Sequence, residues 1–204
     1  MSLTTLTSTR RRLTAYWASA TIHLVAVAFD LRALRMISKA ALMPSLAAWV
    51  RAQQGPPLLV AALLASAVGD VLLEINLLLP AMALFALAHA CYIGEFSRGT
   101  KRRTLLVPLA YAVLSIAVMV TLWPGLGAYR GPIAAYAGML TTTAVTSLWY
   151  GGRTGLGGAL FLASDSLIAA QLAGHDFPLR TYLLKVAYGA GQYQIARGLT
   201  ATSP

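Results

Sequence analysis

The sequence predicts an all-α integral membrane protein, a bundle of about eight transmembrane helices with both termini in the cytoplasm. Of its 204 residues, 58% are hydrophobic and only 11% are charged, whereas soluble domains carry about 25% charged residues. Several apolar stretches approach or reach the roughly 18–20 residues that a spanning helix needs. These stretches are continuously apolar, whereas the strands of a transmembrane β-barrel alternate between polar and apolar residues.

The apolar stretches place a single helical domain at residues 13–197, between a basic cytoplasmic tail at 1–12 and a short tail at 198–204. A charged connection at 30–38 and a proline at position 44 make the second stretch the weakest. The Gly-rich segment GGRTGLGG lacks the Lys-Ser/Thr ending of a phosphate-binding loop, so we expect it to allow close helix approach. The expected helices occupy residues 13–29, 39–50, 57–75, 77–96, 104–123, 131–150, 156–174 and 179–197.

The basic residues predict how the bundle is oriented in the cell (inner or plasma) membrane. With the N-terminus in the cytoplasm, ten Lys and Arg residues fall on that side and five on the other, which favours both termini inside. An odd number of spans would break this pattern. Topology and anionic lipid headgroups account for the net charge of +10, so we expect no nucleic-acid partner. The ten cytoplasmic residues are Arg10, Arg11, Arg12, Arg51, Arg98, Lys101, Arg102, Arg103, Arg153 and Arg197.

The ionisable residues that fall inside the expected spans are Asp70, His89, Asp165 and Lys185. A carboxylate at the bilayer centre costs about 2.5–3.5 kcal/mol or more, so such residues face the protein interior or a water-filled cavity. We predict that all four converge on one cavity. The alternatives are a structural ion pair between an aspartate and Lys185, and a simple interhelical hydrogen bond for His89. Glu74 and Asn76 lie near the interface, where solvation explains them.

Several familiar chemistries are missing from the sequence. No G-x-S-x-G elbow supports a serine lipase mechanism, and no H-E-x-x-H pair marks a zinc site. The single Cys91 excludes an internal disulfide and a cysteine-based metal site. We predict neither a metal nor an organic cofactor, with a divalent ion held by the two aspartates and His89 as the alternative.

Three segments carry a specific combination of motifs: Gly69-Asp70, then Ala88-His89 with Tyr92, then Ser164-Asp165-Ser166. In their order and spacing the chain resembles the YhhN family of multi-pass membrane proteins, which includes the lysoplasmalogenases. The pattern Tyr188-x-x-x-Gln192-Tyr193 looks like the last helix of that family. The resemblance extends from about Lys39 onward. The family has a Lys-Pro pair at the start of its second span, whereas here four residues separate Lys39 from Pro44.

The resemblance implies about eight helices and hydrolysis of the vinyl ether bond of lysoplasmalogens. The products would be a fatty aldehyde and a glycerophospho-choline or -ethanolamine, and the partners would be the lysophospholipid substrate and bilayer lipids. Asp70 and Asp165 would form the catalytic pair. The supporting or substrate-binding residues would be His89, Tyr92, Ser164, Ser166, Lys185, Tyr188 and Gln192.

Vinyl ether hydrolysis begins with protonation of the β-carbon, and water then attacks the oxocarbenium ion. This chemistry needs a proton donor and a nearby negative charge, as in glycosidases that use two carboxylates. Burial would keep one aspartate protonated, while Lys185 or His89 would hold the other ionised. Two other classes stay open. The same carboxylates could form the relay of a small proton-coupled transporter, or they could be structural in a non-catalytic lipid-binding protein.

Overall fold

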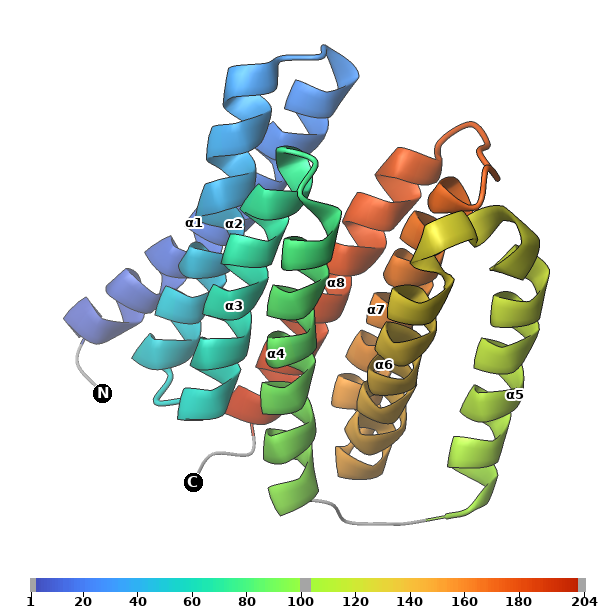
Figure 1. Cartoon of the computed structure of the whole chain (residues 1–204). Helices are drawn as coiled ribbons and strands as arrows, with labels where there is room; N and C mark the ends of the chain where they lie inside the picture. The colour runs from blue at the N-terminus through green and yellow to red at the C-terminus, as the bar shows by residue number, and fades with distance from the viewer. Residues whose placement is uncertain (1–2, 100–103, 202–204) are drawn as a thin grey trace. The chain divides into compact units, whose positions relative to one another are not determined.

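The computed structural model describes residues 3–99 and 104–201, and these residues form helices and turns without any β-strand. The all-helical prediction is therefore confirmed for this part of the chain. Residues 100–103 of the basic segment at 97–103, predicted as a loop, lie outside the described residues, as do the outermost residues of both predicted tails, 1–2 and 202–204. The elements are α1 (Leu3–Ala28), α2 (Arg32–Ala52), α3 (Pro57–Glu74), α4 (Leu78–Arg98), α5 (Leu106–Leu122), the 3₁₀ segment η1 (Trp123–Tyr129), α6 (Arg130–Tyr150), α7 (Gly152–Leu172) and α8 (Arg180–Thr200) (Figure 1).

Four helical segments are long and apolar enough to cross a membrane, and they support a helical membrane protein. One of them combines α5, η1 and α6, where Pro124 and Gly127 with φ +50° break the helix into two. The number of spans and the position of the termini stay predictions. The four segments are Pro57–Glu74, Leu78–Arg98, Leu106–Tyr150 and Gly152–Leu172.

The chain divides into two compact units, Met1–Tyr92 with Leu199–Pro204 and Ile93–Gly198. In the first unit α1 packs on α2 and α2 packs on α3. The turns between its helices contain residues with positive φ, Asp30, Gln54 and Asn76, which are residue types that tolerate this conformation better than β-branched ones. Pro57 opens α3 at a position where no intrahelical donor is lost. The buried core of this unit includes Tyr16, Met43, Leu46, Leu59 and Leu63.

The first two helices begin earlier than the apolar stretches predict. Helix α1 begins at Leu3 rather than at residue 13, and Arg12 Nη1 donates to the Ala48 carbonyl oxygen of α2 at 3.1 Å. Helix α2 begins at Arg32, so most of the predicted connection at 30–38 is helical, and Pro44 lies inside the helix. The reason is that Arg, Leu, Ala and Met are all good helix formers, so a charged stretch continues a helix when its neighbours pack.

In the second unit α5 packs on α6 and α6 packs on α7. A cluster of Leu140, Ala144 and Leu162 forms part of its core. The expected role of the Gly-rich segment is confirmed for three of its glycines, because Gly155, Gly157 and Gly158 lie within α7 where neighbouring helices come very close. A Cβ atom on Gly157 would lie 2.7 Å from the Gly191 carbonyl oxygen and 2.8 Å from the Ile195 nitrogen of α8.

Gly157→Ala is expected to lower the free energy of unfolding by about 1–3 kcal/mol, the usual cost of overpacking. The clash is with backbone atoms of α8, which cannot rotate away. Gly138→Ala is the matched control, since an added Cβ there meets nothing within 4 Å on a helix of the same unit, and alanine is the better helix former. Thermal unfolding in detergent measures both variants. Equal midpoints for the two would contradict the close α7–α8 approach.

The turn between α7 and α8 holds an ion pair between Asp176 and Arg180, the first residue of α8. Arg180 Nε donates to Asp176 Oδ1 at 2.7 Å, and the Phe177 amide donates to the same oxygen at 2.9 Å. The Arg180 hydrogen bond, with a smaller contribution from Phe177, lowers the pKa of Asp176 below its ordinary value of 3.8. The ionised carboxylate therefore stabilises the fold above the unfolded-state pKa, and this contribution disappears as the pH falls through the folded-state pKa.

Asp176→Asn is therefore expected to lower the thermal midpoint at pH 7 but to have no effect in acid. The two proteins should unfold at the same temperature once the pH lies below the folded-state pKa of Asp176, because protonation removes the charge that Arg180 binds. The measurement is a series of unfolding curves in detergent between pH 7 and pH 3. A difference that stays constant over this range would show that the ion pair does not stabilise the turn.

Candidate functional site

Asp70 is a buried carboxylate in the last part of α3, with 3% of its surface exposed. Lys39 of α2 places its Nζ 3.7 Å from Asp70 Oδ1 and 3.3 Å from Glu74 Oε2. Arg35 continues the series of charges, because its Nε pairs with Glu74 Oε1 and its Nη1 lies 3.3 Å from Asp30 Oδ1. We call these five residues, Asp30, Arg35, Lys39, Asp70 and Glu74, the charge network.

The charge network follows from helical spacing on two packed helices. Arg35 and Lys39 are four residues apart on α2, and Asp70 and Glu74 are four residues apart on α3, so each pair lies on one face. The expectation that solvent satisfies Glu74 is wrong, because its side chain is only 11% exposed and forms ion pairs with both cations. The cation found beside Asp70 is Lys39, which the sequence did not point to.

His89 and Tyr92 lie on α4 and are both completely buried. Their rings meet edge to face, with centroids 6.3 Å apart. Phe85, one turn before His89, lies against Gly69 of α3, where an added Cβ would be 3.1 Å from the Phe85 ring. Residues 85, 89 and 92 recur at the spacing of one helix face. The face of α4 that carries His89 and Tyr92 is therefore the one that packs beside the Gly69-Asp70 segment.

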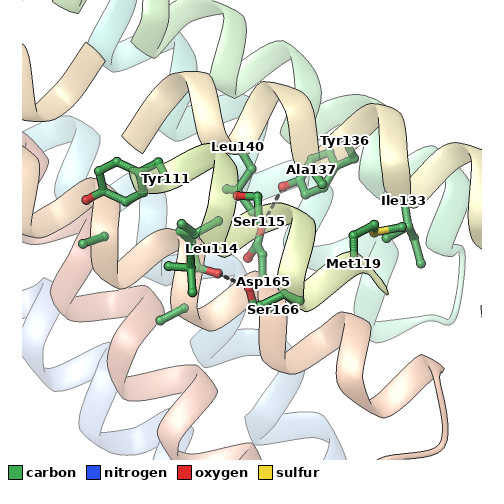
Figure 2. A pocket seen from close by; sticks show the side chains of 14 residues that line it. Tyr111, Leu114, Ser115, Met119, Ile133, Tyr136, Ala137, Leu140, Asp165 and Ser166 are labelled. Carbon is green, nitrogen blue, oxygen red and sulfur yellow. Dashed lines mark hydrogen bonds between the residues drawn. The ribbon is translucent and has the colours of Figure 1, made fainter. Parts of the chain in front are cut away.

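Asp165 lies in the second unit, on α7, at the border of a cavity of about 320 Å³ between α5, α6 and α7 (Figure 2). The Tyr136 hydroxyl of α6 donates to Asp165 Oδ2 at 2.6 Å, and the Ser164 hydroxyl lies 3.1 Å from Oδ1. Ser166 also borders the cavity, and its hydroxyl donates to the Leu162 carbonyl oxygen. The remaining wall is mainly apolar, and its polar exceptions include Ser115 of α5.

The other predicted residues of the second unit lie on α8. Lys185 is half-buried, Tyr188 is nearly buried and Gln192 is completely buried. The Tyr188 ring packs against Phe161 of α7 at a centroid distance of 5.4 Å, one helical turn before Asp165. Because Asp70 and Asp165 belong to different units, their convergence in one cavity with His89 and Lys185 stays a prediction.

The sequence alone does not identify Tyr136, Arg35 and Lys39 as partners of carboxylates. The i, i+4 spacing of Arg35 and Lys39 was a usable signal, but it fell in a segment interpreted partly as a loop. Tyr136 carries no signal of its own within an apolar stretch. Among the described residues, no group of three or more His, Cys, Asp or Glu side chains is arranged to hold a metal ion.

The profile of the YhhN family matches residues 34–199, well over half of the chain. The chain belongs to the YhhN family. The matched region of this YhhN protein includes both aspartates, the Lys39 partner of Asp70 and the Tyr136 partner of Asp165. No curated protein and no solved structure matches the chain.

Proposed function

We propose that this YhhN protein hydrolyses the vinyl ether bond of lysoplasmalogens, releasing a fatty aldehyde and a glycerophospho-choline or -ethanolamine. The observation that carries the proposal is the position of Asp165, a carboxyl group bound by Tyr136 at the border of a mainly apolar cavity. Such a site offers an acid to the ether and an apolar wall to its hydrocarbon chain. Family membership is consistent with this activity.

The two carboxyl groups receive different roles in the proposed reaction. Asp70 lies beside the Lys39 ammonium group, which favours its ionised form. Asp165 borders the apolar cavity that would receive the hydrocarbon chain, so it is the carboxyl group placed to transfer a proton to the vinyl ether. We assign Asp165 as the acid and Asp70 as the carboxylate of the proposed catalytic pair.

The reaction then proceeds in three steps. The π electrons of the vinyl ether take the Asp165 proton at the β-carbon, and the α-carbon becomes part of an oxocarbenium ion. Water adds to the α-carbon and loses a proton to the Asp165 carboxylate, which restores the acid and gives a hemiacetal. The hemiacetal hydroxyl group then loses its proton to a carboxylate as the carbon–oxygen bond to glycerol breaks. That proton passes to the glycerol oxygen, and the aldehyde leaves. Asp70 stabilises the cation, as the second carboxylate does in glycosidases.

The cavity beside Asp165 suits the alkenyl chain. Its volume of about 320 Å³ lies in the range of small-molecule sites, about 300–1,000 Å³. Asp165 lines this cavity, and the apolar part of its wall includes Leu114, Val118, Met119 and Ile133. A lysophospholipid drawn from the bilayer would insert its chain there. We place the protein in the cell membrane as a multi-pass protein, where its substrate and the surrounding bilayer lipids are found.

Aldehyde release by the purified protein in detergent tests the proposal. A lysoplasmalogen should be hydrolysed, while the corresponding saturated alkyl ether should not, because it has no double bond to protonate. The saturated alkyl ether serves as the control for binding and for detergent effects. Absence of aldehyde from the vinyl ether, with the protein folded, would rule out the hydrolase.

A proton-coupled carrier is the second candidate, and one observation favours it. The charge network runs from exposed Asp30 through paired side chains to buried Asp70, as a proton relay would. Proton or solute flux in liposomes without aldehyde release would support the carrier. If neither flux nor hydrolysis is detected, the remaining candidate is a non-catalytic lipid-binding protein.

A further inference from the structure

A second cavity, of about 350 Å³, lies in the first unit, between the α1–α2 turn with the start of α2 and the end of α3 with the turn that follows it. Unlike the cavity beside Asp165, it is lined mainly by charged and polar side chains. Both signs of charge are present within it. We call it the charged pocket, and its lining residues are Asp30, Arg32, Arg35, Met36, Glu74 and Asn76.

Two charged side chains of the charged pocket, those of Arg32 and Asp30, are exposed to a ligand. Arg35 is held by both Asp30 and Glu74, and Glu74 is also held by Lys39. Within the described residues, Arg32 forms no ion pair. The Asp30 side chain is 73% exposed, and its one recorded ion pair is with Arg35 at 3.3 Å. A ligand that carries both a negative and a positive group complements this arrangement.

We propose that the charged pocket binds the phosphoethanolamine headgroup of a lysophospholipid, with its phosphate on Arg32 and its ammonium group on Asp30. The inference rests on the proposed function, because it names the headgroup that the hydrolase prefers. The guanidinium group matches phosphate through two parallel hydrogen bonds. The carboxylate of Asp30 accepts hydrogen bonds from a primary ammonium.

The lining of the pocket distinguishes ethanolamine from choline. Proteins recognise quaternary ammonium groups such as choline with cages of aromatic rings, and none of the six lining residues is aromatic. A trimethylammonium group has no hydrogen to donate to Asp30. A primary ammonium has three donors, and Asp30 and Asn76 offer oxygen acceptors. The pocket therefore favours ethanolamine.

The distance from the pocket to Asp70 fits the glycerol part of such a lipid. Glu74 lines the pocket, and Asp70 lies four residues earlier on the same helix, which is about 6 Å along the axis. The glycerol carbons separate the phosphorus from the vinyl ether oxygen by about 6 Å when extended. A headgroup in the pocket thus brings the reacting bond to the depth of Asp70.

Equilibrium binding to the full-length protein in detergent tests the proposal without requiring turnover. The probes are three saturated alkyl ethers: a lysophosphoethanolamine, a lysophosphocholine and an alkylglycerol that has no phosphate. Wild-type protein should bind the ethanolamine lipid about fivefold more tightly than the choline lipid. Arg32→Gln should weaken binding of both phospholipids about tenfold and leave the alkylglycerol unchanged. Asp30→Asn should abolish the preference for ethanolamine.

Arg153→Gln is the matched control, because it removes one exposed arginine outside the pocket and should change none of these affinities. The proposal is overturned if Arg32→Gln binds all three probes like wild type, if choline binds as tightly as ethanolamine, or if wild type binds no phospholipid. Complete displacement by millimolar inorganic phosphate would also overturn it, since the pocket would then be a site for free phosphate.

The same variants separate this inference from the proposed function. If binding depends on the headgroup but no aldehyde is released from a vinyl ether lipid, the headgroup site is supported and the proposed hydrolase activity is rejected. If aldehyde is released and Arg32→Gln leaves KM unchanged, the hydrolase activity is supported and the headgroup site is rejected.

Discussion

Asp165→Asn is expected to lower kcat for aldehyde release about 10³-fold, the usual contribution of a positioned general acid. The asparagine amide has the shape of the carboxyl group, and its oxygen still accepts the hydrogen bond that Tyr136 donates at 2.6 Å. It cannot deliver a proton to the β-carbon of the vinyl ether. The substrate should still bind, so KM changes little. Single-turnover and steady-state aldehyde assays in detergent measure the two effects separately.

Asp176→Asn is the control for this substitution, because it makes the same chemical change in the turn between α7 and α8. It should leave kcat unchanged. Tyr136→Phe should have a smaller effect than Asp165→Asn, since it removes only the hydrogen bond that orients the acid. Undiminished turnover by folded Asp165→Asn protein would remove this residue from the reaction.

The helices are the part of the structure that sequence predicts well. Continuous apolar stretches define where the helices lie, and proline and glycine residues mark several of the helix ends. Pro56 precedes α3 and Pro57 is its first residue, and Pro124 with Gly125 follows α5. Each of these signals acts locally, through a missing amide donor or a permissive φ, so it survives whatever the helix packs against.

The segment at 30–38 shows where local reasoning fails. Its charges indicated a segment that connects two helices. However, a charged residue can lie within a helix when it forms an ion pair with an opposite charge on a neighbouring helix. Arg35 and Glu74 form such a pair between α2 and α3. The partner is 39 positions away in the chain, so a window around Arg35 shows the helix-forming residue types but not the ion pair that stabilises this part of α2.

Only some residues of the candidate site could be predicted from the sequence. Asp70 and Asp165 could be singled out from sequence, because a carboxylate inside an apolar stretch is costly wherever it lies. Their partners could not, since a tyrosine or lysine near the end of a span has ordinary reasons to be there. Tyr136 and Lys39 become recognisable only when packing brings α6 against α7 and α2 against α3.

Lys39→Met is expected to lower the free energy of unfolding by about 3–5 kcal/mol, the usual cost of breaking a buried ion pair from one side. Lys39 Nζ lies between Asp70 and Glu74, and all three side chains are at most 11% exposed. Methionine fills much of the same volume but leaves Asp70 buried without that cation. Thermal or denaturant unfolding in detergent measures the loss.

Two further variants identify the cause of that loss. Arg98→Met breaks an ion pair with Glu95 in which the arginine side chain is 69% exposed, so it should cost less than about 1 kcal/mol. Asp70→Asn combined with Lys39→Met should recover part of the stability, because the uncompensated charge is removed with its partner. A loss from Lys39→Met no larger than that from Arg98→Met would show that Lys39 does not neutralise Asp70. The carboxylate would then need another cation to stay ionised, and the assignment of Asp70 as the charged member of the catalytic pair would lose its support.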